Sequence, residues 1–289
     1  MNNSKHYSPQ WLGDCLGARA LLAMVRNWPL PRGQSGLLRI ITRWCFQGLL
    51  PLRHWHDGRL RVDVTDYIGQ QLAQVGAFEP LSLALACQLM KGGGWFVDAG
   101  CNMGLYTCVV GSLPGVRTLA IDPSPLALAQ LERNLALNPA VDCIRVYAAL
   151  SRESGFVQFE IPGPQNLGTG RVQTTNGSGK ILAYGLPAAQ ILPEANCSPV
   201  RLLKIDIESG ELAALHGWDW TASGRPRHIL CEHLKADETP DTLQLQDFLR
   251  SMDYQPYTVE GEPWDGCQPL PENNLWWQDK NLPHDLMKE

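Results

Sequence analysis

From residue 92 onward, the apolar positions of the chain follow strand-like and helix-like spacings in turn. Short apolar runs predict parallel strands at residues 95–97, 116–121, 143–149, 201–208 and 228–233. Between the second and third runs, Leu128, Leu131 and Leu135 recur at helical spacing behind Pro125, a residue that suits the first turn of a helix. Strands that alternate with helices in this way indicate an α/β fold, with a mostly parallel sheet and helices on both of its faces.

The chain before this core has a different pattern. Apolar residues predict helical patches at 11–27 and 37–46. We therefore expect a mainly helical N-terminal extension over residues 1–56. Its tryptophans Trp28, Trp44 and Trp55 need burial, so the extension should pack on the core or on a second subunit, which makes a homodimer one option. The favoured interpretation is that the segment extends the fold and has no catalytic role, and the alternative is that it forms a lid over an acceptor site.

Composition places the chain among ordinary globular proteins. Of its 289 residues, 44% are hydrophobic and 18% are charged, which is enough to bury a sizeable core. The net charge is −5, and no Lys- or Arg-rich run gives the electrostatic footprint of a nucleic-acid-binding protein. Nucleic acid is therefore disfavoured as a partner, unless the fold assembles a basic patch from separate segments.

The cysteines and the lengths of the apolar runs indicate the cellular compartment of the protein. The nine cysteines are scattered and include no C-x-x-C pair, so we expect reduced thiols and predict no metal ligands. No apolar run approaches the roughly 18 residues that a membrane span requires. We expect a cytoplasmic protein without a membrane span.

A glycine-bearing turn follows the first core strand. Asp98 lies at the carboxyl end of that strand, and Gly100, Asn102 and Gly104 follow before a helix begins. Ligands bind at this place in open α/β sheets, and glycines let a cofactor approach the main chain. A dinucleotide fold would have a glycine at position 102, so Asn102 argues against NAD and for a ligand without phosphates.

The ends of the second and third core strands are candidate sites for a ribose and for an adenine ring. Asp122 ends the second strand, where such folds hydrogen-bond a ribose diol. The third strand ends without a carboxylate, so backbone and apolar groups around Ala149 would hold an adenine ring. A strand, an acidic glycine turn, a helix, a second strand, a second acid and a second helix form the order expected of a class I S-adenosylmethionine (SAM) methyltransferase core.

Charged residues also mark the fourth and fifth core strands. Lys204, Asp206 and Glu208 alternate along the fourth run and should share one face of a strand. The fifth run delivers Glu232 and His233 to the same rim. Buried charges are costly unless they are paired or face a site, so these residues form either a structural ion cluster or the border of a catalytic crevice. Their expected place beside the first strand favours the crevice.

Three motifs together resemble the FkbM family of SAM-dependent methyltransferases. They are the Asp98-x-Gly100-x-Asn102-x-Gly104 turn, the Lys204-x-Asp206-x-Glu208 strand and the Ile229-Leu230-Cys231-Glu232 strand. The resemblance covers about residues 57–235 plus the closing strands. One departure is that Ser209 stands where the family commonly has glycine after the last acid of its Lys-x-Asp-x-Glu strand.

This resemblance implies a fold, a cofactor and a reaction. The implied fold is a seven-stranded Rossmann-like domain over residues 57–289, with the cofactor half at 92–150 and an acceptor-side loop at 156–193. The implied reaction is O-methylation by SAM of a hydroxyl on a small molecule, a sugar or glycan, or a polyketide-type product. The resemblance also implies which residues meet SAM: Asp98, Gly100, Asn102 and Gly104 at its methionine end, Asp122 at its ribose, and Glu79 at the border of the pocket.

The acceptor hydroxyl must lose a proton as it attacks, so a base must lie within hydrogen-bond reach. Asp206 is the first candidate and His233 the second, with Glu232 on the same rim and Lys204 placed to raise the acidity of the acceptor. The alternatives are an N-methyltransferase, an NAD-type oxidoreductase, or a SAM-binding regulatory subunit without activity.

Overall fold

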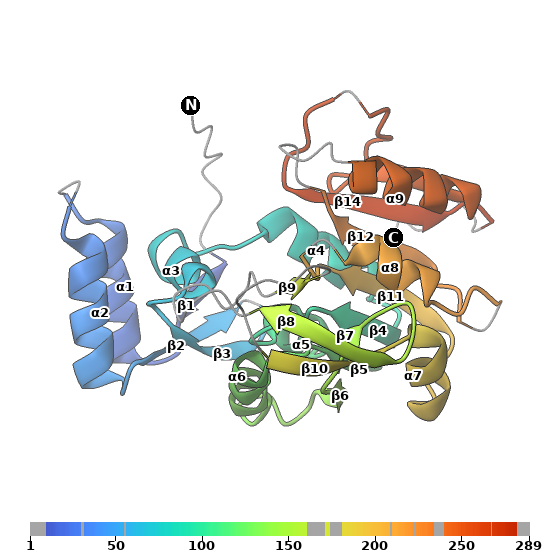
Figure 1. The fold of residues 1–289 in the computed structure, drawn as a ribbon. Coiled ribbons are helices and arrows are strands. Elements are labelled where there is room, and N and C mark those ends of the chain that lie inside the picture. Colours follow the sequence, from blue (N-terminus) through green and yellow to red (C-terminus); the bar gives the residue numbers. More distant parts are fainter. Residues whose placement is uncertain are drawn as a thin grey trace.

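The computed structural model describes residues 10–29, 32–54, 56–160, 171–173, 181–208, 210–221, 224–233, 240–266 and 268–281. Its centre is a seven-stranded sheet (Figure 1). In spatial order the strands are β13 (Tyr254–Thr258), β14 (Asn274–Asp279), β12 (His228–Glu232), β11 (Val200–Ile205), β4 (Gly94–Ala99), β5 (Val116–Ile121) and β6 (Asp142–Val146). The strands from β12 to β6 are parallel, and β14 is antiparallel to both of its neighbours. This order confirms the predicted seven-stranded, mostly parallel Rossmann-like sheet.

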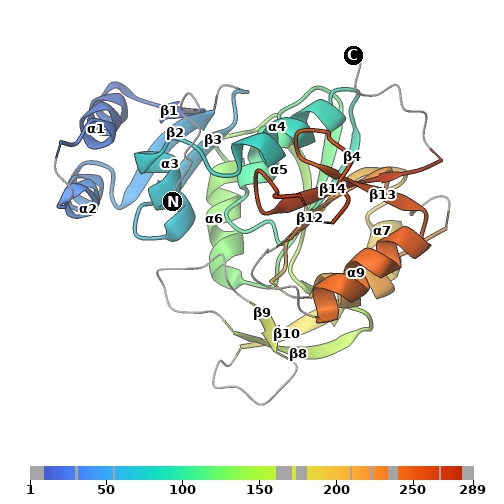
Figure 2. The same ribbon diagram turned by 90° about the horizontal axis from the view of Figure 1, so that it is seen from above.

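Alternate residues of the central strands point to opposite faces and form two cores. Phe96 and Leu202 lie in one core, and their neighbours Val97 and Leu203 lie in the other. The first face is covered by α4 (Pro80–Leu89), α5 (Leu105–Val110) and α6 (Pro125–Leu135), and the second by α7 (Ala188–Glu194), α8 (Glu211–His216) and α9 (Pro240–Ser251) (Figure 2). Helices on both faces are what the sequence pattern predicts.

Two core strands end earlier than predicted. β11 ends at Ile205, so Asp206 and Glu208 follow the strand and do not continue it. The backbone N–H of Asp206 still donates to the carbonyl of Ala99 (3.1 Å), but Glu208 has a left-handed φ of 58°. β6 ends at Val146. The chain leaves both strands at the carboxyl edge of the sheet, which is the edge that carries the candidate site.

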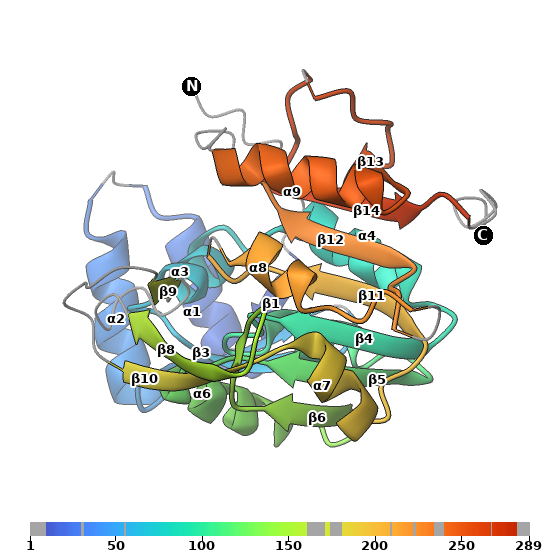
Figure 3. The same cartoon turned by 45° about the vertical axis from the view of Figure 1, so that its right-hand side comes forward.

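A second sheet follows β6 along the chain (Figure 3). Its strands are, in spatial order, β7 (Ala149–Leu150), β10 (Ile181–Leu186), β8 (Gly155–Glu160) and β9 (Arg171–Gln173). Ala149 thus pairs with β10 instead of extending β6, so the predicted strand at 143–149 is too long. Within the predicted acceptor-side loop at 156–193, residues 161–170 and 174–180 lie outside the described residues.

The N-terminal extension is mainly helical, as predicted, but it also contributes strands. Its elements and those that follow are β1 (Trp11–Gly13), α1 (Leu16–Arg26), α2 (Gln34–Cys45), β2 (Leu49–His54), β3 (Arg59–Asp63) and α3 (Tyr67–Gln74). Arg26 fixes α1 to α3, because its guanidinium donates to the carbonyls of Leu72 and Ala73 (both 3.0 Å). The β2–β3 hairpin crosses the predicted domain boundary at residue 56, and that boundary stays a prediction.

Within the chain, Trp28 and Trp44 of the N-terminal extension are less buried than expected. Trp28 is half-buried, whereas Trp44 on α2 is 81% exposed, so Trp44 is not buried on the core of its own chain. Its burial on a second subunit stays a prediction. Trp55 lies outside the described residues. Among those residues no helix is both long and apolar enough to cross a membrane.

Candidate active site

The carboxyl ends of three neighbouring strands gather charged side chains at one edge of the sheet. β4, β11 and β12 are adjacent and parallel, and Lys204 on β11 lies in register with Asp98 on β4. Asp206 directly follows β11, and Glu232 ends β12. The strand order therefore brings Asp98, Lys204, Asp206 and Glu232 together at the edge where ligands bind in open α/β sheets.

The glycines of the turn after β4 are required by contacts within the protein. Gly100 has a φ of +79°, and a β-carbon at this position would lie 1.8 Å from the carbonyl oxygen of Asp206. Gly104 has a φ of +87°, and a β-carbon there would lie 2.4 Å from Cδ1 of Leu131. Close packing of the turn on β11 and α6 thus explains both glycines, beside any approach of a cofactor.

Asp122 organises the same turn from the end of β5. Its Oδ2 accepts the backbone N–H of Asn102 (2.9 Å), and its Oδ1 accepts the backbone N–H of Ser124 (2.8 Å). Burial raises the pKa of Asp122 to about 6, although both hydrogen bonds act in the opposite direction. Asp122 therefore has a structural role, and its predicted contact with a ribose comes in addition to it.

Lys204 is buried and surrounded by acids. Its Nζ lies 3.0 Å from Oδ2 of Asp206 and 4.8 Å from the ring centroid of Tyr106. Burial lowers the pKa of Lys204, but the charges of Asp206, Glu79 and Asp98 outweigh burial and raise it above its ordinary value. Lys204 is therefore a fixed positive charge beside Asp206.

Glu79 approaches this pair through Tyr106. The phenolic O–H of Tyr106 donates to Oε2 of Glu79 (2.8 Å), and Glu79 has a left-handed φ of 45° at the residue before α4. Burial raises the pKa of Glu79, while the charge of Lys204 acts against this rise. Glu79 therefore lies near Lys204, and its place at the border of the cofactor pocket stays a prediction.

Asp98 lies deeper than the other acids. It is 1% exposed, and its Oδ2 accepts the hydroxyl of Thr107 (2.6 Å). Burial raises the pKa of Asp98, against the effect of the Lys204 charge and the Thr107 hydrogen bond. Its Oδ1 is buried without a partner among the described residues, and the same holds for Oδ1 of Asn102. Two acceptor atoms of the glycine turn are thus free to accept hydrogen bonds from a ligand.

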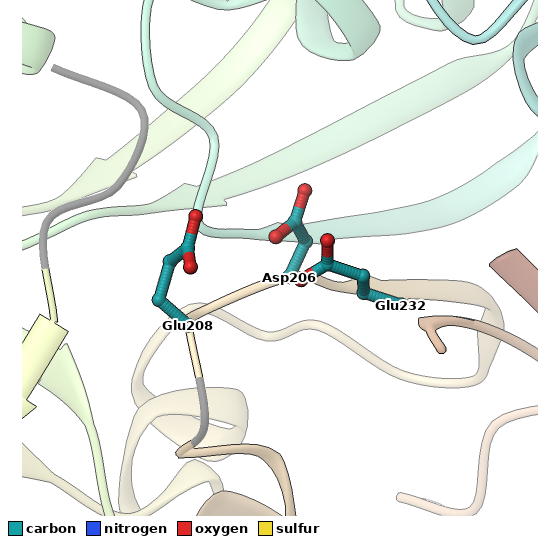
Figure 4. A group of neighbouring side chains, drawn as sticks. All are labelled: Asp206, Glu208 and Glu232. Atoms are coloured by element: carbon teal, nitrogen blue, oxygen red, sulfur yellow. The ribbon is translucent and has the colours of Figure 1, made fainter. Parts of the chain in front are cut away.

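Three carboxylates form a second cluster at the rim. One oxygen each from Asp206, Glu208 and Glu232 lie within 4.8 Å of one another (Figure 4). Burial, together with the charges of Asp206 and Glu208, raises the pKa of Glu232 to about 9, so this group holds a proton at neutral pH. Carboxylate oxygens are also ligands of divalent cations, but acidic groups gather without an ion as well. The cluster by itself assigns no metal.

His233 follows Glu232 and is buried. Its backbone N–H donates to the carbonyl of Asn273 (2.7 Å), and its ring packs edge-on against Trp264 with the centroids 5.1 Å apart. The ring of His233 thus lies against the loop after β13. Its predicted role as a base stays a prediction.

A comparison with family models decides the relationship of the chain. Residues 98–256, more than half of the chain, match the model described as the methyltransferase FkbM domain. The chain belongs to the FkbM methyltransferase family. The match begins at Asp98 and includes Asp206 and Glu232, so it spans the charged edge described above.

Solved structures of other methyltransferases resemble this FkbM protein. An FkbM methyltransferase from Methylobacillus flagellatus is 20% identical, with a TM-score of 0.43 and coverage of 64% of this chain and 43% of that one. An rRNA methylase from Streptococcus thermophilus is 11% identical (TM-score 0.39; 69% and 94% covered), and a TehB-like SAM-dependent methyltransferase from Corynebacterium glutamicum is 13% identical (TM-score 0.41; 74% and 95% covered). This chain thus spans less than half of the Methylobacillus protein. Because these TM-scores are low, the fold assignment rests on the strand order and the family match.

No curated protein matched the chain.

Membership of the family makes SAM the cofactor, and the glycine turn fits it. SAM carries hydrogen-bond donors on its amino group and on its ribose, and the turn offers the unpartnered oxygens of Asp98 and Asn102. The methyl sulfonium is positive, and Glu79, Asp98 and Asp206 surround the one buried lysine of this edge. An acid-rich edge suits a cationic ligand electrostatically.

Sequence reasoning missed two side chains that support this site, Tyr106 and Thr107. Tyr106 and Thr107 connect to Glu79 and Asp98, and Glu208 completes the carboxylate cluster. Polar residues on an otherwise apolar helix were the available signal for Tyr106 and Thr107. The sequence pattern already places Glu208 with Lys204 and Asp206 at the border of the crevice.

Proposed function

We propose that this FkbM-family protein methylates a hydroxyl group, carried by a small molecule, a sugar or glycan, or a polyketide-type product. SAM supplies a methyl group that is already activated by its sulfonium leaving group. The observation that carries the proposal is the Lys204–Asp206 pair, which places a carboxylate beside the glycine turn. A carboxylate can serve as the base that O-methylation needs, because the attacking hydroxyl must give up its proton.

The cofactor would lie along the carboxyl ends of β4 and β5. Asp98 and Asn102 would accept hydrogen bonds at its methionine end, next to the close backbone of Gly100 and Gly104. Asp122 would accept hydrogen bonds from the ribose hydroxyls through the oxygen lone pairs that its two backbone hydrogen bonds do not use. Two further residues would contact the cofactor: Glu79, and Ala149, which is buried in β7 beyond the end of β6.

The proton would move from the acceptor to the rim of the site. The oxygen of the acceptor bonds to the methyl carbon, the bond from that carbon to sulfur breaks, and the hydroxyl proton passes to Asp206. Lys204 stabilises the developing negative charge on the acceptor oxygen. Glu208 lies close enough to Asp206 for the proton to be shared before it reaches water. His233 is the second candidate for the base.

An amine is the second class of acceptor. Asp206 and Glu208 at the rim attract a cationic group, and an amine would fit beside them as well as a hydroxyl would. N-methylation would leave the cofactor contacts unchanged. Analysis of the methylated atom in the product separates the two reactions.

The test compares Asp206→Asn with wild type. Methyl transfer from labelled SAM is measured over a panel of hydroxylated and aminated acceptors, and SAM binding is measured separately. We expect turnover to fall by about 10²–10⁴-fold, the usual contribution of a general base, while SAM affinity changes by a few-fold at most. Asp142→Asn is the matched control, because Asp142 is an exposed partner of Arg117 at the start of β6.

Three results would change the proposal. Unchanged turnover in Asp206→Asn would remove Asp206 as the base and leave His233. Transfer only to nitrogen would replace O-methylation by N-methylation. Saturable SAM binding without transfer to any acceptor would indicate a regulatory subunit.

A further inference from the structure

Charge is divided unequally between the N-terminal extension and the rest of the chain. Seven of the 24 Lys and Arg residues but only one of the 29 acidic residues lie within residues 1–56, which gives this segment a net charge of +6. The remaining 17 basic and 28 acidic residues give residues 57–289 a net charge of −11. A basic extension on an acidic protein indicates an anionic partner for the extension.

Helix α2 turns apolar side chains outward next to arginines. Only two of its residues are buried, whereas Ile40 is 59% and Trp44 is 81% exposed. Arg39 and Arg43, which precede them in the sequence, are exposed as well. Residues four apart lie on the same face of a helix, so Ile40 and Trp44 form an apolar stripe beside a stripe of two arginines.

These two arginines are available to a ligand. Neither Arg39 nor Arg43 has an acidic partner in the part of the chain that the structure describes. Other arginines of the extension are engaged: Arg26 donates to backbone carbonyls, and Arg53 pairs with Asp57. Arg39 and Arg43 therefore place two positive charges on the outer face of α2, without an acidic partner among the described residues.

The apolar surface continues onto α1. Leu16, the first residue of α1, is 83% exposed. A β-carbon on the next residue, Gly17, would lie 3.5 Å from the ring of Phe46, which follows the last turn of α2. Leu16 and Trp44 thus lie at the same end of the α1–α2 hairpin. Figures 1 and 2 both place this hairpin at one end of the molecule, away from α9 and β13.

We infer that the outer face of the α1–α2 hairpin, defined by Leu16, Arg39, Ile40, Arg43 and Trp44, docks on the surface of an anionic lipid bilayer. Tryptophan and aliphatic side chains enter the interface between headgroups and acyl chains, where an amphipathic basic helix lies in the membrane plane. Guanidinium groups bind lipid phosphates in the same layer. The docking face is separate from the candidate active site and does not depend on the acceptor.

The exposed aliphatic residues favour a bilayer over a nucleic acid. Nucleic acids are bound by cations that meet phosphates and by aromatic rings that stack on bases. That mode of binding gives no role to Leu16 and Ile40. A bilayer uses all five residues of the docking face, because it offers anionic phosphates and apolar chains side by side.

The test is co-sedimentation of the full chain with lipid vesicles. Vesicles of phosphatidylcholine alone are compared with vesicles that contain about 30% phosphatidylglycerol as the anionic lipid. We expect binding to the anionic vesicles only, weakened by added salt. Trp44→Ser, and separately the double variant Arg39→Gln/Arg43→Gln, should each lower the partition coefficient by roughly tenfold or more.

Matched controls come from the β8 region. Phe156→Ser removes an aromatic side chain that is 77% exposed, and Arg152→Gln removes an arginine whose side chain is 67% exposed. Both controls should bind as wild type does. Since all five substitutions in these four variants are at exposed positions, the fold should be retained in each.

Several results would overturn the inference. One is absence of binding to anionic vesicles, and another is equal binding by wild type and by both α2 variants. If vesicles do not bind but Trp44→Ser converts a dimer into a monomer, the face is an interface between two copies. If vesicles do not bind but single-stranded RNA does, through the same arginines, the partner is a nucleic acid.

Discussion

Gly100 has two reasons to lack a β-carbon, and only one of them could be predicted. The sequence places a glycine turn after a strand that ends in an acid, which predicts a cofactor close to the main chain. The structure adds the carbonyl of Asp206, which lies where a β-carbon of Gly100 would be. Such a contact joins turns that are far apart in the sequence, so it depends on strand order and cannot be derived from local pattern.

Glu232 supplies a prediction on pH and stability. In the folded protein its pKa is raised to about 9 by burial and by neighbouring carboxylates, whereas an unfolded glutamate ionises near its ordinary value of 4.5. Between these two values the folded state keeps a proton that the unfolded state releases. Wild type therefore loses stability as pH rises through this window, and Glu232→Gln does not suffer this loss.

Thermal unfolding from pH 5 to pH 9 measures the effect. We expect the difference in Tm between Glu232→Gln and wild type to increase with pH. Each kcal/mol of difference in the free energy of unfolding should correspond to roughly 2–4 °C. Glu153→Gln, at a side chain that is 84% exposed, should show no such trend. A Tm difference that stays constant across this pH range would contradict the raised pKa of Glu232.

At the scale of elements, hydrophobic spacing predicts the long elements well and the short ones poorly. The strand at 116–121 and the helix that Pro125 opens are observed as β5 and α6. The two-residue strand β7 and the three-residue strand β1 were not predicted, because strands this short are defined by their pairing partners and not by their own pattern. The exposure of Trp44 was missed for a similar reason, since hydrophobicity alone does not say which face of a helix is covered.

Helix α4 supplies a prediction at this scale. Glu79, the residue before the helix, gives no side-chain cap, and Glu272 from the loop before β14 takes this role. Its Oε1 accepts the N–H of Leu81 (2.7 Å), and its Oε2 accepts the N–H of Ser82 (2.8 Å). Glu272→Ala leaves both donors of the first turn without this partner, so we expect a loss of about 1–2 kcal/mol in the free energy of unfolding.

Urea denaturation measures this loss. Glu272→Gln keeps one carbonyl acceptor and should lose less than Glu272→Ala. If Glu272→Ala and wild type unfold with equal free energies, the cap contributes nothing.

At the scale of the whole molecule, parallel strands concentrate the candidate chemistry at one edge. The fold follows from the sequence because alternating strands and helices allow few topologies, and right-handed crossovers place the acids of β4, β5, β11 and β12 at the same edge. The partners of these acids depend on three-dimensional packing. Tyr106 reaches Glu79, and Thr107 reaches Asp98, because α5, which carries both residues, packs on the sheet.

The most direct test of the account is calorimetric titration with S-adenosylhomocysteine, because it needs no knowledge of the acceptor. Wild type, Asp98→Asn and the control Asp142→Asn are compared. We predict saturable binding by wild type and by the control, and a loss of about 1–3 kcal/mol of binding free energy in Asp98→Asn, where an amide NH2 replaces one of the two carboxylate oxygens. Absence of binding in wild type, or equal binding by Asp98→Asn, would contradict a cofactor site at the glycine turn.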